Sequence, residues 1–347
     1  MYFSPAPKKR KEDFFNMEEE LEMFQKNLGL GKFIVVSGLR RYGKTSLILT
    51  ALNSLCLDYI FVDCRLLPTG MFSLNDFIFL LEDELNRRSW AKRLLKNVDG
   101  VEVSGLRLRF RRRDRTLLLN VIEKLEHKIL VIDEAQELRR TNYRFDSLLA
   151  YIYDHIDLKV VISGSQVGLL YKFLRVEDPE APLYGRPYLE VKLKRLNVQK
   201  SREFLERGFE QEGLNVSSTL IDEAVNRFDG IIGWLTYFGY SYARSRRTVE
   251  EVVEKASKMS VNELKHAIEV YGLGKKRYIE TLKIVASSDG LRWSEIKRAL
   301  EARMGKIPNN TLSNILENLV NQGFLEKANE GYSITDPILK IGILKHL

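Results

Sequence analysis

The residues with the clearest capacity for chemistry form the run Gly38-Leu39-Arg40-Arg41-Tyr42-Gly43-Lys44-Thr45, which is followed by Ser46. Its glycines and its Lys-Thr pair have the spacing of a phosphate-binding loop, in which backbone N–H groups close around phosphate oxygens. We expect Lys44 to reach the outer phosphates of a nucleotide as a point charge, and Thr45 to offer its hydroxyl to Mg²⁺. An ordinary glycine turn would not require this spacing, so residues 38–46 are predicted to bind nucleotide phosphates.

The segments on either side of this run must place it between a strand and a helix. The apolar residues 33–36 precede the loop, and residues 46–49 continue as an apolar helical pattern. A second short apolar strand, residues 59–62, follows and ends at Asp63. Strand, helix and strand in this order predict a parallel sheet, and therefore an α/β fold.

A second group of candidate residues closes another apolar strand. Residues 129–132 are followed directly by Asp133 and Glu134. Ligands of parallel α/β sheets collect at the carboxyl ends of the strands, so both carboxylates should lie beside the phosphate loop. Asp133 is predicted to hold Mg²⁺ through water, and Glu134 to orient and deprotonate an attacking water. The alternative is an acidic loop after a buried strand.

Three further candidates lie next to later strands, two serines after one strand and an arginine before the last. Residues 159–162 form an apolar strand, after which Ser165, with Ser163 as second choice, is predicted to reach the terminal phosphate or the attacking water. A turn with serine caps is the alternative. Arg186 stands just before the last predicted strand, residues 188–193, and is predicted to stabilise transition-state charge from its own subunit or from a neighbouring one. A surface ion pair is equally compatible with its position.

Composition bounds the class of protein. The 347 residues are 44% hydrophobic, which is enough for a sizeable core and roughly two or three domains. The two cysteines, Cys56 and Cys64, lack metal-ligand spacing, and we interpret them as free thiols of a cytoplasmic protein. The basic start of the chain, residues 8–11, predicts a solvated tail, and no stretch is long and apolar enough for a membrane helix.

The formal net charge is +8, and much of the positive charge gathers after an alternating segment, residues 101–110, that predicts a hairpin. One interpretation is an electrostatic contact for nucleic acid. The other is a charged hairpin edge that resists unwanted strand pairing, which we favour because only Phe110 interleaves the cluster as an aromatic residue. The arginines concerned are Arg107, Arg109, Arg111, Arg112, Arg113 and Arg115.

Taken together, these motifs resemble the archaeal ATPase family of P-loop proteins, which is related to the AAA+ and STAND ATPases. The double arginine in the phosphate loop and a Leu-Tyr-Gly-Arg stretch are the specific parts of the resemblance. Two positions depart from the family pattern, since Met17 stands in place of an arginine and Ile232 in place of a proline. The matching segments are residues 14–21, 38–45, 130–134, 164–166, 183–186 and 229–235.

The resemblance implies a RecA-like or AAA+-like P-loop NTPase core with a parallel sheet in residues 1–195 and an all-α lid in residues 196–275. The last segment, residues 276–347, has the pattern of a winged helix: three helices, residues 276–287, 292–302 and 310–322, are followed by two short strands around a turn at residues 329–331. The resemblance also implies ATP and ADP as the nucleotides, with Mg²⁺. In the lid, the periodic aromatic residues Trp234, Tyr237 and Tyr240 are predicted to belong to a core rather than to a ligand site.

The expected function is Mg²⁺-dependent ATP hydrolysis that switches a conformation. Two alternatives are a DNA-binding regulator licensed by ATP, and a nucleotide-binding interaction protein with negligible turnover. The predicted third helix of the winged helix carries no lysine or arginine between Pro308 and Glu326, although exposed asparagines can read adenine edges. A protein contact or an intramolecular clamp is therefore favoured over DNA for this domain, and a homo-oligomer stays open.

Overall fold

The computed structural model describes residues 1–15, 17–105, 107–329 and 331–347. Three residues lie outside the described residues. They are Asn16 in the segment 14–21 that resembles the family, Leu106 in the predicted hairpin, and Glu330 in the turn of the predicted winged helix. The chain forms two compact units. The first, called here the sheet unit, contains residues 8–39 and 44–193; the second, the helical unit, contains residues 1–7, 40–43 and 194–347.

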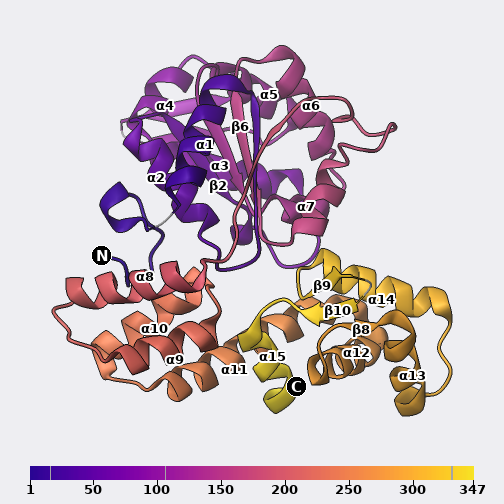
Figure 1. The fold of residues 1–347 in the computed structure, drawn as a ribbon. Helices are drawn as coiled ribbons and strands as arrows, with labels where there is room; N and C mark the ends of the chain where they lie inside the picture. The colour runs from indigo at the N-terminus through magenta and orange to yellow at the C-terminus, as the bar shows by residue number, and fades with distance from the viewer. Residues whose placement is uncertain (16, 106, 330) are drawn as a thin grey trace. The chain divides into compact units, whose positions relative to one another are not determined.

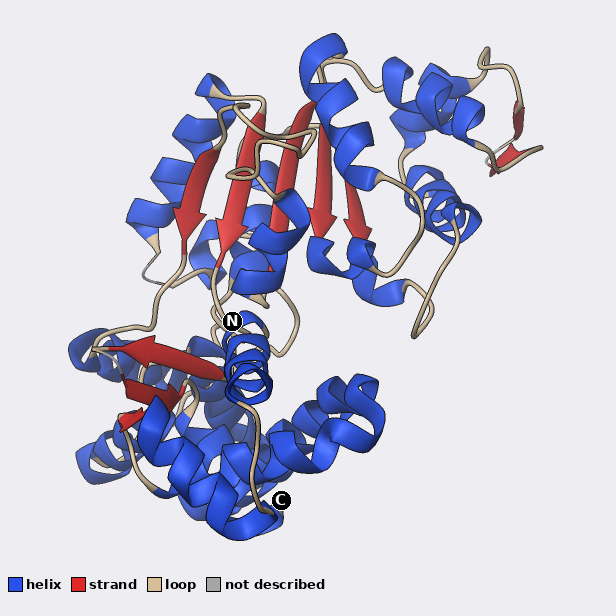
Figure 2. Cartoon of the chain, turned by 90° about the vertical axis from the view of Figure 1, so that its right-hand side faces the viewer, coloured by secondary structure: helices blue, strands red, loops and turns tan. Residues whose placement is uncertain are grey.

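The sheet unit is built on a five-stranded parallel sheet in which all arrows run in one direction (Figure 2). The register places Asp63 opposite Asp133, and Ser37 opposite Gly164, so four strands end at one edge. The predicted α/β class and parallel core are confirmed. In spatial order the strands are β2 (Tyr59–Asp63), β5 (Ile129–Asp133), β6 (Lys159–Gly164), β1 (Phe33–Ser37) and β7 (Leu189–Lys192).

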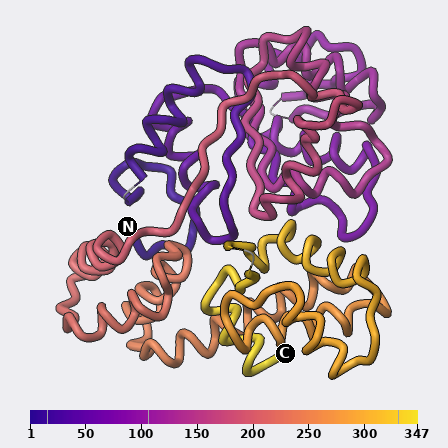
Figure 3. The backbone as a smooth tube through the Cα atoms, turned by 45° about the vertical axis from the view of Figure 1, so that its right-hand side comes forward, coloured from indigo at the N-terminus to yellow at the C-terminus, as the bar shows by residue number. Residues whose placement is uncertain are grey.

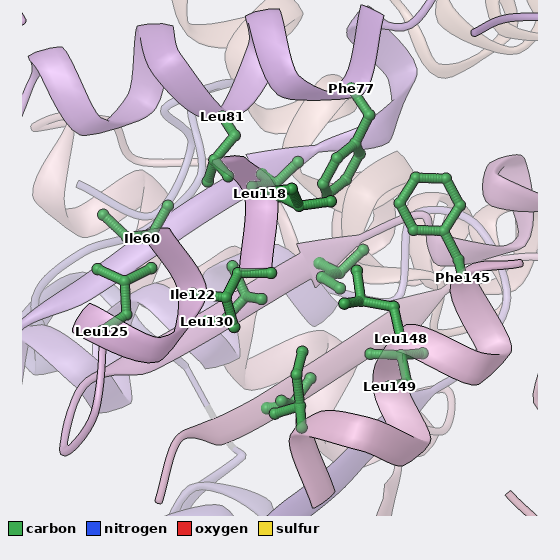
Figure 4. Close-up of a cluster of buried hydrophobic side chains, with 14 of the residues drawn as sticks. Ile60, Phe77, Leu81, Leu118, Ile122, Leu125, Leu130, Phe145, Leu148 and Leu149 are labelled. Atoms are coloured by element: carbon green, nitrogen blue, oxygen red, sulfur yellow. The ribbon is translucent and has the colours of Figure 1, made fainter. Parts of the chain in front are cut away.

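Helices cover both faces of this sheet, as in other parallel sheets, and its central strands β1 and β5 are therefore buried throughout. On one face, side chains of α3, α5 and α6 converge on strand residues such as Ile60 and Leu130 (Figure 4). Helices α1 and α2 contact one another, and α1 also contacts β1 and β7. The helices of this unit are α1 (Glu18–Leu30), α2 (Lys44–Ser54), α3 (Leu74–Asn86), α4 (Ser89–Leu95), α5 (Arg115–Lys124), α6 (Phe145–His155) and α7 (Val167–Leu174), with short 3-10 turns at η1 (Lys11–Asp13), η2 (Cys64–Leu66) and η3 (Ala135–Arg139).

Between residues 72 and 95 the chain forms the two helices α3 and α4. A capping box of Ser73 and Asp76 starts α3. At its end, the Asn86 side chain accepts a hydrogen bond from the Leu108 N–H at 2.8 Å and donates one to the Leu108 carbonyl at 2.7 Å. The helix end is therefore tied to the predicted hairpin, which is present as β3 (Val101–Ser104) and β4 (Arg107–Phe110). Sequence periodicity does not record this long-range tie.

The helical unit begins with a bundle whose helices follow one another along the chain (Figure 3). Residues 249–268 form one continuous helix, because Val252, Ala256, Ser260 and Leu264 keep one buried stripe without a break. The bundle helices are α8 (Val198–Gln211), α9 (Ser218–Phe228), α10 (Ile232–Ser245) and α11 (Val249–Ile268), and η4 (Glu269–Gly274) follows them.

The C-terminal residues form the predicted winged helix, with a three-stranded antiparallel sheet in the order β8-β10-β9. A final helix, α15, was not predicted. Gly342 lets it approach α11, since a Cβ there would lie 2.6 Å from the Ser257 carbonyl oxygen. The elements are α12 (Lys275–Ser287), β8 (Leu291–Arg292), α13 (Trp293–Met304), α14 (Asn309–Asn321), β9 (Leu325–Ala328), β10 (Gly331–Ile334) and α15 (Pro337–His346).

The start of the chain lies against α8 within the helical unit (Figure 1). The Phe3 ring is buried and meets the rings of Phe204 and Phe209 edge-on. Gly208 and Gly239 make room for it, since a Cβ at either position would fall 2.2 to 2.3 Å from the Phe3 ring. Of the predicted tail, residues 8–11, residues 9–11 are exposed, whereas Lys8 is half-buried and its backbone N–H donates to the Ser46 hydroxyl at 3.0 Å. The apolar anchor ahead of that tail was missed.

Both cysteines are free thiols, with Cys56 exposed and Cys64 buried. Across residues 1–15, 17–105, 107–329 and 331–347, no helix combines the length and the apolarity needed to cross a membrane.

Candidate functional site

The phosphate loop joins β1 to α2, as the sequence predicts. Gly38 and Gly43 have φ of +151° and +88°, values that residues other than glycine rarely adopt. The Lys44 ammonium, which is almost fully buried, donates to the carbonyl oxygens of Gly38 at 2.8 Å and Leu39 at 2.9 Å. The lysine charge is thus folded over the loop, beside the backbone that is expected to surround phosphate oxygens.

The tip of the loop, residues 40–43, belongs to the helical unit. Arg41 has φ of +67°, which is strained for a side chain of this size. Its guanidinium pairs with Glu263 of α11 and lies 3.9 Å from the centroid of the Trp234 ring, while its carbonyl accepts the Gly233 N–H at 2.9 Å. Arg40 reaches the same Glu263 at 3.2 Å. Glu263 is a contact that sequence reasoning missed.

Aromatic residues complete this region of the helical unit. The Tyr42 hydroxyl accepts a hydrogen bond from Nε of Arg195 at 3.0 Å, and burial raises the pKa of Tyr42. Trp234 is fully buried and donates through its indole N–H to Asp336 at 2.9 Å. The prediction of a core role is confirmed for Trp234, whereas Tyr240 is 40% exposed and does not belong to the core.

Asp133 lies buried at the end of β5 and accepts two hydroxyl hydrogen bonds. Thr45 donates to Oδ2 at 2.9 Å, and Ser163 donates to Oδ1. Burial, with the neighbouring Glu134 carboxylate, raises the pKa of Asp133. Neighbouring oxygens around Mg²⁺ lie about 3 Å apart when its bonds are about 2.1 Å long. The Thr45 hydroxyl and the Asp133 carboxylate lie 2.9 Å apart and offer the oxygen ligands that Mg²⁺ prefers, the carboxylate directly or through a water, so the residues present fit the ion.

Glu134 is the residue after the strand and takes the left-handed conformation, with φ of +54°. Its Oε2 accepts hydrogen bonds from the Gln136 amide at 2.6 Å, the Ser165 hydroxyl at 2.7 Å and the Ser165 N–H at 3.1 Å. Burial acts to raise the pKa of Glu134, but the Lys44 ammonium and these hydrogen bonds outweigh it and hold that pKa below its usual value. The Glu134 carboxylate is therefore ionised near neutral pH, which is the form that a general base requires.

The two serines thus meet the two carboxylates, Ser163 with Asp133 and Ser165 with Glu134. In this structure Ser165 positions Glu134, and its predicted contact with a terminal phosphate stays a prediction. Gln136 plays the same part from η3 and was missed by sequence reasoning. Its proximity to Glu134 in the chain was the available signal, because a side chain two residues on can return to the same carboxylate.

Removal of the Ser165 hydroxyl gives a pH-dependent prediction. In Ser165→Ala, Glu134 loses one of the hydrogen bonds that lower its pKa, so that pKa should rise. A base must be ionised to act, and the acid limb of the hydrolysis rate should consequently move to higher pH. We expect the rate to fall about tenfold at acidic pH and to approach wild type at alkaline pH. A pH profile of turnover checks this, and a uniform loss at every pH would contradict it.

Arg186 lies at the other edge of the sheet. Its Nε and Nη2 pair with Asp154 at 3.0 and 2.6 Å, and its Nη1 donates to the Pro182 carbonyl. Asp154 is near the end of α6, five residues before β6 begins at Lys159, and Arg186 precedes β7. Both therefore lie at the amino ends of the strands, whereas Lys44 and Asp133 lie at the carboxyl ends. The structure does not bring Arg186 to these residues within one chain, and its use by a neighbouring subunit stays a prediction.

Three of the six arginines in the cluster at the hairpin are ion-paired. Arg111 lies 3.5 Å from Glu102, Arg112 lies 3.0 Å from Asp99, and Arg113 lies 3.0 Å from Glu82. Such pairing is expected of a charged hairpin edge and leaves less positive charge for phosphates. The prediction of a nucleic-acid contact here remains untested.

Comparison with known proteins decides the family. Residues 14–238 match the profile of a family described as an ATPase domain predominantly from Archaea. The chain belongs to this archaeal ATPase family. Residues 274–335 match a second profile, the C-terminal winged helix-turn-helix domain of MCM proteins. The predicted resemblance and the predicted winged helix are both confirmed.

Two relatives of this archaeal ATPase extend the comparison. The structure of a Walker-type ATPase of Pyrococcus abyssi is similar over 99% of both chains, with a TM-score of 0.85 and 33% sequence identity. An uncharacterized protein of Methanocaldococcus jannaschii is 26% identical over 205 residues, which cover 57% of this chain. The chain spans 40% of the length of that curated relative.

Proposed function

We propose that this archaeal ATPase binds ATP with Mg²⁺ and hydrolyses it to ADP and phosphate. The observation that carries the proposal is the position of Glu134, an ionisable carboxylate held by Ser165 and Gln136 beside the Thr45–Asp133 pair. The Pyrococcus abyssi relative, whose whole chain is similar, is described as a Walker-type ATPase and supports the same reaction class.

Each residue has one task in the proposed reaction. The loop backbone and Lys44 bind the phosphates, and Lys44 places its charge at the outer ones. Glu134 accepts a proton from water as the water oxygen bonds to the terminal phosphorus and the bond from that phosphorus to the bridging oxygen of ADP breaks. Thr45 and Asp133 would hold Mg²⁺, which neutralises charge on the phosphates when bound. Adenine as the base is taken from the family.

We further propose that hydrolysis switches a conformation. Support comes from the loop tip, where Arg40 and Arg41 pair with Glu263. A bound phosphate attracts the same guanidinium groups, so nucleotide and Glu263 compete for them. Gain and loss of the terminal phosphate would then change how the loop tip is held in the helical unit. A partner protein, or DNA, at the winged helix would respond to that change, and the lack of lysine and arginine between Pro308 and Glu326 favours a protein.

The proposal is tested by nucleotide binding and steady-state hydrolysis of the full chain and of Lys44→Met, with and without Mg²⁺. The substitution removes one charged donor, and we expect ATP affinity to fall about 10- to 100-fold, with loss of turnover. Lys200→Met is a matched control, because Lys200 pairs with Glu203 on the surface of α8. A wild-type chain that binds ATP tightly without turnover would favour the interaction-protein alternative. Stimulation by duplex DNA would favour the regulator.

A further inference from the structure

One arginine, Arg65, lies beside the candidate metal carboxylate Asp133 and has no part in the site described so far. Arg65 lies in η2, the turn that follows β2. Since Asp63 is the register partner of Asp133, the turn starts at the level where β5 delivers its carboxylate. The adjacent Cys64 is fully buried in the core and anchors the turn. Arg65 therefore projects from a fixed point at the carboxyl edge of the sheet.

The Arg65 side chain is held in one orientation. Its Nε lies 2.9 Å from Oδ1 of Asp63, and its Nη2 lies 2.6 Å from Oδ2. The backbone N–H of Arg65 also donates to Asp63, at 3.0 Å. Such a two-point pair fixes a guanidinium plane. Within the described residues, no acceptor meets Nη1, and the side chain remains 58% exposed. The two N–H donors of Nη1 are thus held in a fixed orientation without an acceptor among the described residues.

The position of these donors relative to Asp133 points to an anionic ligand. Nη2 of Arg65 lies 3.9 Å from Oδ2 of Asp133, the oxygen that also accepts the Thr45 hydrogen bond. The Asp63 pair occupies only one edge of the Arg65 guanidinium, so the other edge, which includes Nη1, is left to bind an anion. The terminal phosphate of ATP is an anion expected in this region, because it would bind the same Mg²⁺ that Asp133 is predicted to hold.

The order of the strands sets the side of approach. From the phosphate loop at β1, the sheet continues through β6 to β5 and then to β2. Lys44 follows β1 and Arg65 follows β2, so the two cations approach the region of Asp133 from opposite sides. We propose that Arg65 contacts the terminal phosphate of the nucleotide from the side opposite Lys44 and stabilises charge there during hydrolysis. This inference rests on the function proposed above and gives the chain an arginine of its own for the role that Arg186 cannot fill within one subunit.

The test compares Arg65→Ala, Arg65→Lys and wild type in three measurements: affinity for ADP, affinity for a non-hydrolysable ATP analogue, and turnover of ATP. For Arg65→Ala we expect turnover to fall about 100-fold or more, as for the loss of one preorganised donor. The analogue should bind at least about tenfold more weakly, with ADP affinity unchanged, because ADP lacks the terminal phosphate. Arg65→Lys, which retains the charge without the fork, should recover part of both losses.

Arg144→Ala is the matched control. Arg144 makes the same two-point pair with the aspartate two residues away, Asp146, at 2.9 and 3.0 Å, and is similarly exposed. It should leave all three measurements unchanged. Equal losses of ADP and analogue binding in Arg65→Ala would show a structural role and overturn the proposal, as would turnover equal to wild type. If wild type itself neither binds nor hydrolyses ATP, the proposed function fails first, so the two failures are distinguishable.

Discussion

Glu134→Gln is expected to abolish most ATP hydrolysis while ATP binding survives. The substitution keeps the size of the side chain and an oxygen that can accept from Ser165 and Gln136, so the local hydrogen bonds can persist. An amide cannot take a proton from water, and the loss of a general base lowers a rate by about 10²- to 10⁴-fold. Removal of a negative charge facing Lys44 should leave nucleotide affinity equal or higher.

The measurement is steady-state phosphate release together with equilibrium ATP binding. Glu137→Gln is a suitable control, because Glu137 lies three residues on in η3 and pairs with Arg140 at 2.8 Å. Its turnover should remain within about twofold of wild type. Equal turnover in Glu134→Gln and wild type would remove Glu134 as the base. Loss of ATP binding would instead indicate that its charge organises the phosphate loop.

Local sequence patterns were enough to predict the parallel sheet and the residues that its strands and loop place at the candidate site. Four of the five predicted strands of the sheet are short apolar runs, and in a parallel sheet both faces are buried, so the run itself is the signal. The edge strand β7 instead alternates, with Glu190 and Lys192 exposed. The positions of Lys44, Asp133 and Glu134 follow, since each stands directly after such a strand or loop. The same reasoning placed both serines after a strand, but it assigned them to the terminal phosphate or the attacking water and did not predict their contacts with Asp133 and Glu134.

Other features depended on contacts far apart in the chain. The pairing of Arg41 with Glu263 joins residues 222 positions apart, and no local pattern encodes it. Arg186 shows a different failure, because a residue that precedes a parallel strand lies at the amino edge, opposite the carboxyl edge where ligands collect. That rule was available from the sequence and disfavours an in-subunit role. Arg65 was overlooked because a single arginine after a strand has no motif around it.

Asp133→Asn is expected to lower hydrolysis about 10²- to 10³-fold and to raise the Mg²⁺ concentration needed for nucleotide binding at least about tenfold. The buried carboxylate accepts from Thr45 on one oxygen and from Ser163 on the other. Asparagine offers only one oxygen, and its NH₂ group donates, so one hydroxyl must turn away and the charge that attracts the ion is lost. Magnesium titrations of both binding and turnover measure this effect.

The thermal stability of Asp133→Asn should hold or rise while its hydrolysis falls, and this difference separates a metal-binding role of Asp133 from a structural one. Burial raises the pKa of Asp133, which means that the folded protein disfavours the ionised form at neutral pH. A neutral amide relieves that cost, so the melting temperature of Asp133→Asn should hold or rise. Ser163→Ala is the companion variant, because it keeps the charge and removes one donor, and its Mg²⁺ requirement should change less. An Asp133→Asn protein that melts earlier and keeps its Mg²⁺ dependence would identify Asp133 as a structural hydrogen-bond acceptor instead.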